Sequence, residues 1–262
     1  MTAHVAERGD RYGFRHAAKM EWIKLRSLRS TWITLALTVA GAVGMGLAIG
    51  VNSKNPHADV TNNVLAGIVS GLLITGVLGV LTVSGEYTSG SIRGSLAAIP
   101  NRPKLLAAKA AVFGAAALVA GELAAFIAFF AGTSVLPSSI PPPSLGDPGV
   151  LRAVMLSGTA LCLIGLLGLG LGAIIRHTGA AVAALVGGMY VGAQFLGALA
   201  HAAIPYVPIA IVGDSLARAV PVPPEAQEFA QPLGPWAGFG MLTLYAAVAL
   251  GIGAWLMARR DA

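Results

Sequence analysis

The sequence predicts an all-α integral membrane protein with six transmembrane helices. Hydrophobic residues make up 56% of its 262 residues and charged residues only 11%, whereas soluble globular domains carry about 25% charged residues. Six apolar runs each reach the length of about 20 residues that a helix needs to cross a hydrocarbon core of about 30 Å. We therefore interpret residues 1–262 as a single membrane domain. The predicted spans are residues 32–51, 64–83, 105–131, 151–175, 179–204 and 236–257.

The chain before the first span, residues 1–31, is predicted to be a cytoplasmic tail followed by an amphipathic interfacial helix. From Phe14 onward, apolar side chains recur at helical period and basic side chains follow a second stripe. We expect this helix to lie flat on the bilayer, with basic groups reaching the headgroups. A solvated basic helix is the alternative. The expected membrane-interface residues here are Arg15, Lys19, Trp22, Arg26 and Arg29.

The segment 85–104, between the second and third spans, is polar and basic and contains several glycines and prolines. Read at helical period, Ile92, Leu96 and Ile99 form a small apolar stripe, and polar residues gather on another face. Pro100 and Pro103 end the helix. The pattern predicts a short helix that docks on a partner protein, and its candidate docking residues are Glu86, Gly90, Ile92, Arg93, Leu96 and Ile99.

The distribution of positive charge predicts the orientation of the chain. Of the 17 Lys and Arg residues, 14 flank the spans on the side that holds both termini and residues 85–104, and only Lys54, Arg152 and Arg218 lie on the other side. By the positive-inside rule, both termini are expected in the cytoplasm. Arg102, Lys104 and Lys109 are predicted to anchor the start of the third span at the headgroups. Because the Lys and Arg residues are distributed by the side of the membrane, their excess argues for a membrane topology and against nucleic-acid binding.

Two polar residues inside the predicted spans are candidate functional groups. A carboxylate such as Glu122 costs roughly 2.5 kcal/mol or more at the centre of a bilayer. It therefore has to be protonated, paired or facing water. Glu122 and Gln194 are expected either to line a substrate path or to form polar contacts between helices. Between the last two spans, residues 205–235 form a broken outer segment that is too short to span.

Close helix packing is predicted at four GxxxG pairs, in which the small residues let backbones approach. The pairs are Gly46 with Gly50, Gly67 with Gly71, Gly168 with Gly172, and Gly188 with Gly192.

Several enzyme motifs are absent from the sequence. None of the five lysines follows a glycine as in the phosphate-binding GxxxxGK[ST] loop, no histidine is followed by glutamate as in HExxH, and no GxSxG occurs. We therefore expect no catalytic site, metal or nucleotide cofactor in this chain. If the protein uses ATP, a separate subunit has to hydrolyse it.

The sequence resembles the ABC-2 type permeases of bacterial ATP-binding-cassette transporters. The resemblance rests on EWIKLRSLRSTW at residues 21–32, on Glu86 followed by Gly90-Ser91-Ile92-Arg93, and on the six-span plan with a broken outer segment before the last span. An Ala- and Gly-rich composition with more arginine than lysine is typical of actinobacterial members. The resemblance covers nearly the whole chain.

The resemblance implies an exporter subunit in the cell membrane. It implies pairing with a second permease half, which is a copy of the chain or a sibling, and with cytoplasmic ATPase subunits that bind ATP and Mg²⁺. Residues 85–104 would then contain the coupling helix, and the substrate would be amphipathic or lipophilic. Two other hypotheses stay open: a secondary transporter driven by protons or ions through Glu122, and a non-transporting membrane scaffold or immunity protein.

Overall fold

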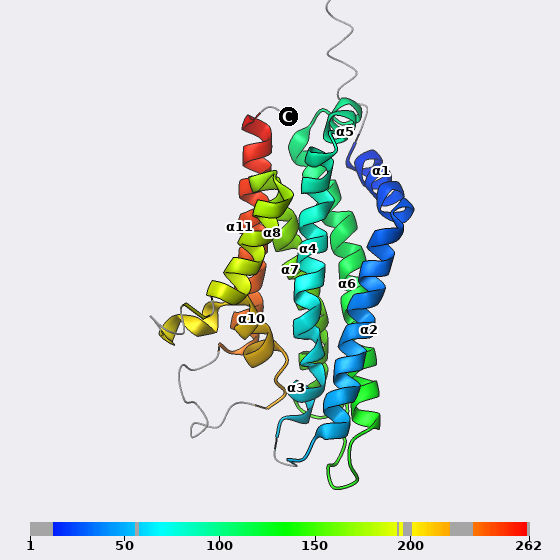
Figure 1. Cartoon of the computed structure of the whole chain (residues 1–262), viewed down its shortest axis with the longest axis vertical. Helices are drawn as coiled ribbons and strands as arrows, with labels where there is room; N and C mark the ends of the chain where they lie inside the picture. The colour runs from blue at the N-terminus through cyan, green and yellow to red at the C-terminus, as the bar shows by residue number, and fades with distance from the viewer. Residues whose placement is uncertain (1–12, 56–57, 193, 196–200, 221–232, 261–262) are drawn as a thin grey trace, which may run out of the picture.

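Long apolar helices run side by side along the long axis of the molecule in the computed structural model (Figure 1). The structure describes residues 13–55, 58–192, 194–195, 201–220 and 233–260, and these residues form helices, turns and loops without a strand. The helices of the first half are α1 (Phe14–Ser27), α2 (Arg29–Asn52), α3 (Val60–Leu65), α4 (Gly67–Thr88), α5 (Ile92–Ala98) and α6 (Arg102–Ser134). Those of the second half are α7 (Val150–Ile175), α8 (Thr178–Val186), η2 (Gly187–Val191), η3 (His201–Tyr206), α10 (Pro208–Ala210), η4 (Ile211–Leu216) and α11 (Pro235–Arg259).

Five helical stretches are long and apolar enough to cross a membrane. They are Arg29–Asn52, Val60–Thr88, Arg102–Ser134, Val150–Ile175 and Pro235–Arg259, and they contain five of the six predicted spans. The chain thus has the architecture of an all-α, multi-pass membrane protein. The predicted span at 179–204 is not confirmed, because its apolar helix, Thr178–Val191, is shorter and residues 193 and 196–200 lie outside the described part.

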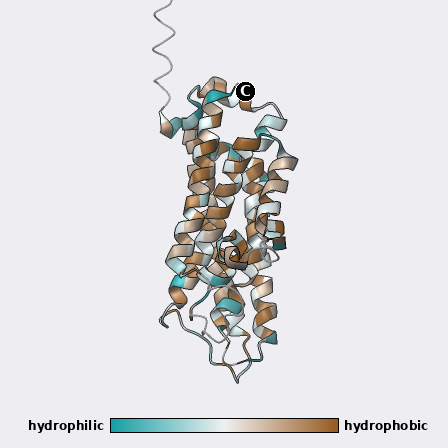
Figure 2. Cartoon of the chain, turned by 90° about the vertical axis from the view of Figure 1, so that its left-hand side faces the viewer, coloured by the Kyte–Doolittle hydropathy of each residue, from teal (hydrophilic) through white to brown (hydrophobic). Residues whose placement is uncertain are grey.

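Apolar residues cover the length of the bundle, and polar residues gather toward its two ends (Figure 2). One end carries α1, α5 and the end of α11, and we call it the α5 end. The other end carries α3 and the loop that joins α6 to α7, and we call it the opposite end (Figure 1). The break between α3 and α4 at Ala66 lies near the opposite end.

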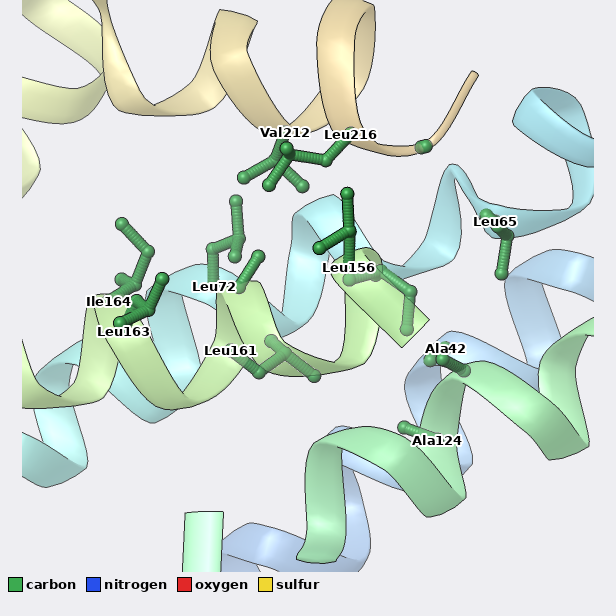
Figure 3. Packing of buried hydrophobic residues seen from close by; sticks show 14 of the residues in the cluster. Ala42, Leu65, Leu72, Ala124, Leu156, Leu161, Leu163, Ile164, Val212 and Leu216 are labelled. Atoms are coloured by element: carbon green, nitrogen blue, oxygen red, sulfur yellow. The ribbon is translucent and has the colours of Figure 1, made fainter. Parts of the chain in front are cut away.

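The core forms around α7, which packs against α4, α6 and α11. Helix α2 packs on α4 and α6 and covers the other side of these two helices. Buried side chains from α2, α3, α4, α6, α7 and η4 form one continuous cluster. Figure 3 shows part of it, with Leu72, Leu156 and Leu161 inside and Val212 and Leu216 of η4 above them.

Three of the four predicted GxxxG pairs lie at helix crossings. A Cβ at Gly172 would lie 2.8 Å from the Val80 carbonyl oxygen, and one at Gly168 would overlap the Gly76 carbonyl. Gly46, Gly50 and Gly67 likewise face the backbone of neighbouring helices, and Gly71 faces the side chains of Thr38 and Leu161. The pair at Gly188 and Gly192 contacts no other helix in the described residues. The missing side chains let α7 approach α4 and α2 approach α6.

Residues 86–99 form two helices and not the single docking helix that the sequence pattern suggested. Helix α4 continues through Glu86 and ends at Thr88, and Gly90 follows with a φ of 72°, in the left-handed region that glycine tolerates. Helix α5 begins only at Ile92. Glu86 therefore belongs to the last turn of a long helix.

We predict that Gly168→Val destabilises the protein by about 1–3 kcal/mol or more, because the new side chain meets the α4 backbone and overpacks the crossing. The measurement is thermal or denaturant unfolding of the purified protein in detergent.

The matched control is Gly251→Val, since Gly251 lies within α11 and has open space at its Cβ. Both substitutions change helix propensity equally. Equal losses of stability for the two variants would contradict close α4–α7 packing.

Candidate functional site

The α5 end is built where α1, α5 and the first turns of α6 meet. Ala17 of α1, Ile92 and Ile99 at the two ends of α5, and Leu105 and Ala108 of α6 form a separate buried cluster. Small alanines on α1 and α6 let these helices approach closely, and Tyr87 and Leu96 pack against the same cluster. The apolar stripe of α5 therefore faces inward, and it attaches α5 to the bundle.

A ring of four charged side chains lies directly beside this cluster. The Lys109 ammonium is 2.8 Å from a Glu21 oxygen and 2.6 Å from a Glu86 oxygen. The Lys24 ammonium is 2.9 Å from Glu86 and 3.2 Å from Glu21. Each carboxylate thus contacts both lysines, and the charges balance. We call Glu21, Lys24, Glu86 and Lys109 the charge ring.

Ser95 connects α5 to the charge ring. Its hydroxyl accepts a hydrogen bond from Lys24 at 2.7 Å and lies 3.1 Å from the second oxygen of Glu86, to which it donates. Ser95 is buried. Four helices, α1, α4, α5 and α6, are therefore joined through one set of polar contacts.

The contribution of the charge ring to stability depends on the burial of its side chains. The Lys109 side chain is 1% exposed, Glu21 5%, Glu86 14% and Lys24 35%. Removing one partner from a buried ion pair costs about 3–5 kcal/mol, because an uncompensated charge is left behind. Burial alone would lower the pKa of Lys24, but its hydrogen bond to Glu86 and the negative charges of Glu21 and Glu86 outweigh that effect and raise the pKa. Lys24 therefore stays charged at neutral pH.

The end of α4 is also tied to the turn between α7 and α8. The guanidinium of Arg176 lies 4.9 Å from the centre of the Tyr87 ring, a cation–π contact. The Thr178 hydroxyl donates to Ser84 at 3.0 Å and lies 3.2 Å from that of Thr88. Helix α4 is thus fixed on two sides at the level of the charge ring.

The structure divides the predicted docking residues into two groups. Ile92 and Ile99 are buried, Leu96 is half-buried, and Glu86 belongs to the charge ring. Gly90 and Arg93 are exposed. The exposed face of α5 consists of Arg93, Gly94, Ala97 and Ala98. The sequence pattern located the helix and its apolar stripe, and the structure shows that this stripe packs inside the chain.

The predicted membrane-interface residues also fall into an exposed group and a group packed inside the chain. Arg15, Lys19, Trp22, Arg26, Arg29 and Lys104 are exposed. The prediction for Lys109 is wrong, since this side chain is buried in the charge ring. Arg102 is half-buried and donates to the carbonyl oxygens of Met257, at 3.1 Å, and Arg260, so it connects α6 to the end of α11.

Glu122 and Gln194 lie away from the charge ring. Glu122 faces α7, where the Thr159 hydroxyl donates to its Oε1 at 2.9 Å. Its other oxygen, Oε2, is buried without a hydrogen-bond partner in the described residues. Gln194 is exposed and lines a pocket of about 300 Å³ with Tyr190, Val191 and Ile209. The described residues contain no group of three His, Cys, Asp or Glu side chains placed to hold a metal ion.

Comparison with protein-family models gives no match, and comparison with curated protein sequences gives no significant match. The resemblance to ABC-2 type permeases therefore stays a prediction. The charge ring is a property of this structure and stands independently of it.

Sequence reasoning missed the pairing inside the ring. One signal was present: Ala17, Glu21 and Leu25 recur every four residues, which places Glu21 on the buried face of α1. A carboxylate on a buried face needs a cation. Lys109 provides that cation from a position 88 residues away, and a single sequence does not reveal such a contact.

We predict that Lys109→Met lowers the free energy of unfolding by about 3–5 kcal/mol, because Glu21 and Glu86 then share only Lys24. Denaturant unfolding of the purified protein measures the loss. The double variant Lys109→Met with Glu86→Gln has a balanced charge ring again, and it is expected to recover part of the lost free energy of unfolding.

Lys104→Met is the matched control, since Lys104 is exposed one turn earlier on the same helix. Its effect is expected to stay within about 0.5 kcal/mol. A small effect of Lys109→Met, comparable to that of the control, would contradict a buried charge ring.

Proposed function

We propose that this chain is the membrane-spanning permease subunit of an ABC-2 type ATP-binding-cassette transporter in the cell membrane. A separate cytoplasmic ATPase would bind ATP and Mg²⁺ and supply the energy. The proposal rests on α5, a short helix between the long apolar helices α4 and α6. The buried charge ring supports one side of α5, and the other side is exposed.

The attachment of α5 suits the transmission of force. Its inner face is packed against α1 and α6, and Ser95 bonds to the ring that joins those helices to α4. A displacement of α5 would therefore move the ends of three helices together. Rigid-body movement of this kind is how a cytoplasmic subunit can change access to a membrane path.

The outer face of α5 suits close contact with a partner. Gly94, Ala97 and Ala98 are small and exposed, so a partner backbone can approach, and Arg93 adds a charged hydrogen-bond donor. On the proposed function this face binds the ATPase, and the α5 end lies in the cytoplasm with both termini. The second permease half would be a copy of this chain or a sibling.

The pocket beside η2 supports the proposed substrate class. The pocket at Tyr190 combines apolar walls with the Gln194 amide, an arrangement that suits an amphipathic or lipophilic molecule. We propose export of such a molecule.

On this proposal, Arg93→Glu and Gly94→Trp reduce transporter-stimulated ATP hydrolysis at least tenfold while leaving the unfolding curve of the permease unchanged, because both alter only the exposed face of α5. The measurement is ATPase activity of the permease reconstituted in liposomes with the ATPase encoded beside it.

Lys54→Glu is the charge-matched control, since Lys54 is exposed near the opposite end, after the last residue of α2. Full activity of both α5 variants, or failure of the two subunits to co-purify, would overturn the proposed function.

A secondary transporter is the second candidate, favoured by the buried and unpartnered Oε2 of Glu122 in the described structure. A proton relay through this carboxyl predicts that Glu122→Gln abolishes gradient-driven transport. On the proposed ABC function, ATP-dependent transport persists in this variant. Flux measurements with an imposed proton gradient and with ATP separate the two candidates.

A further inference from the structure

A carboxyl group lies between α6 and α7, far from the charge ring. Glu122 is about three turns from Ser134, the nearer end of α6. The exposed side chains around it are apolar, and they are Leu118, Val119 and Leu123 of α6 and Met155 of α7. In a chain with membrane-spanning architecture, the surroundings of this carboxyl group are therefore hydrocarbon and protein.

Two glycines bring α6 and α7 into contact at this level. A Cβ at Gly121 would overlap the Gly158 carbonyl, and a Cβ at Gly158 would lie 2.9 Å from Oε2 of Glu122. Oε1 of Glu122 accepts a hydrogen bond from the Thr159 hydroxyl at 2.9 Å, whereas Oε2 is buried without a partner in the described part of the chain. The backbone of α7 thus packs directly on the carboxyl group.

No cation compensates a charge on Glu122 among the residues that the structure describes. On α7, the Cys162 thiol donates to the Gly114 carbonyl at 3.3 Å, and Arg152, about two turns before Thr159, donates to the Arg218 carbonyl. The charged residues of the other long helices that pack on α6 lie in their terminal turns, and they are Arg29 of α2, Glu86 of α4 and Arg259 of α11. Lys109, on α6 itself, is bound in the charge ring.

These contacts favour the neutral form of the carboxyl group. An ionised carboxylate in apolar surroundings needs a cation and several hydrogen bonds, and Glu122 has one hydrogen bond. A neutral carboxyl group leaves only one polar atom unsatisfied, which costs far less. Because Oε1 accepts from Thr159, the proton belongs on Oε2, the oxygen that lies against Gly158.

We propose that the crossing of α6 and α7 is a proton-binding site at Oε2 of Glu122, and that the two helices pack closely here only while the proton is bound. Release of the proton to water leaves an ionised carboxylate, which is stable only after α6 has moved away from Gly158 and water has entered. Since α6 also carries Lys109 of the charge ring, this movement would reach the helices that hold α5. The inference does not depend on the energy source of transport.

The single cysteine of the chain reports on this crossing. Cys162 lies one turn after Thr159 on the same face of α7, is 7% exposed and donates to α6. A maleimide reaches such a thiol only when the helices open locally. The labelling rate is measured in the native chain and in Glu122→Gln, both purified in nanodiscs. The amide of this variant keeps the shape of the side chain and stays neutral at every pH.

The ratio of the two rates, native chain to Glu122→Gln, is the informative quantity. It is expected to be close to unity at about pH 6 and to rise about tenfold or more by about pH 9, over the range in which buried carboxyl groups release their protons. Ionisation of the thiol accelerates labelling in both proteins and cancels in the ratio. A negative charge on Glu122 alone would disfavour the thiolate and lower the ratio. A rise therefore reports opening of the crossing.

The matched control is Ala173→Cys in a Cys162→Ser background, since Ala173 is buried on the same helix near the α5 end. The ratio measured at this position, with and without Glu122→Gln, is expected to stay constant with pH. A rise at position 173 equal to that at Cys162 would show general loosening and overturn the proposal, as would an unchanged ratio at Cys162.

Infrared spectroscopy measures the proton itself. The native chain minus Glu122→Gln is expected to show the carbonyl stretch of a protonated carboxylic acid at about pH 6, and in the native chain alone this band is expected to disappear by about pH 9. Absence of the band at the lower pH would overturn the proposal.

Discussion

The pairing of two lysines with two glutamates under α5 is the interaction on which the arrangement of the α5 end depends. Charges in an apolar surrounding are tolerated only when they are paired and hydrogen-bonded. Glu21 and Lys109 therefore fix the position of α1 against α6, and Glu86 fixes the end of α4 against both. The apolar cluster around Ile92 adds packing but has less directional specificity.

The same constraint explains why so short a helix is well placed. Helix α5 has only 7 residues, far below the length at which an isolated helix is stable. Its inner side chains are packed and Ser95 is bonded to the ring, so tertiary contacts determine its position. A surface that must transmit movement needs such a rigid support, and this need links the packing to the proposed function.

Hydropathy predicted most of the fold because membrane helices follow a simple rule of length and apolarity. The structure does not confirm the sixth predicted span, residues 179–204, because its apolar helix, Thr178–Val191, is shorter and becomes π-helical at Gly187. The break at Gly90 was misread because a glycine tolerates both helical and left-handed backbone. Periodicity identified the apolar stripe of α5 but not its partners, which are α1 and α6 of the same chain. Lys109 follows the pattern of a headgroup anchor, and its true contacts come from α1 and α4.

The proposed function requires that the exposed face of α5, supported by the charge ring, contacts the ATPase. Site-specific photocrosslinking in intact membranes tests it most directly, with a benzophenone amino acid at Ala97 on that face and, for comparison, at Lys54 near the other end. The expected result is a crosslink from position 97 to the ATPase and none from position 54. Absence of the crosslink from position 97 in membranes that contain both subunits would contradict it.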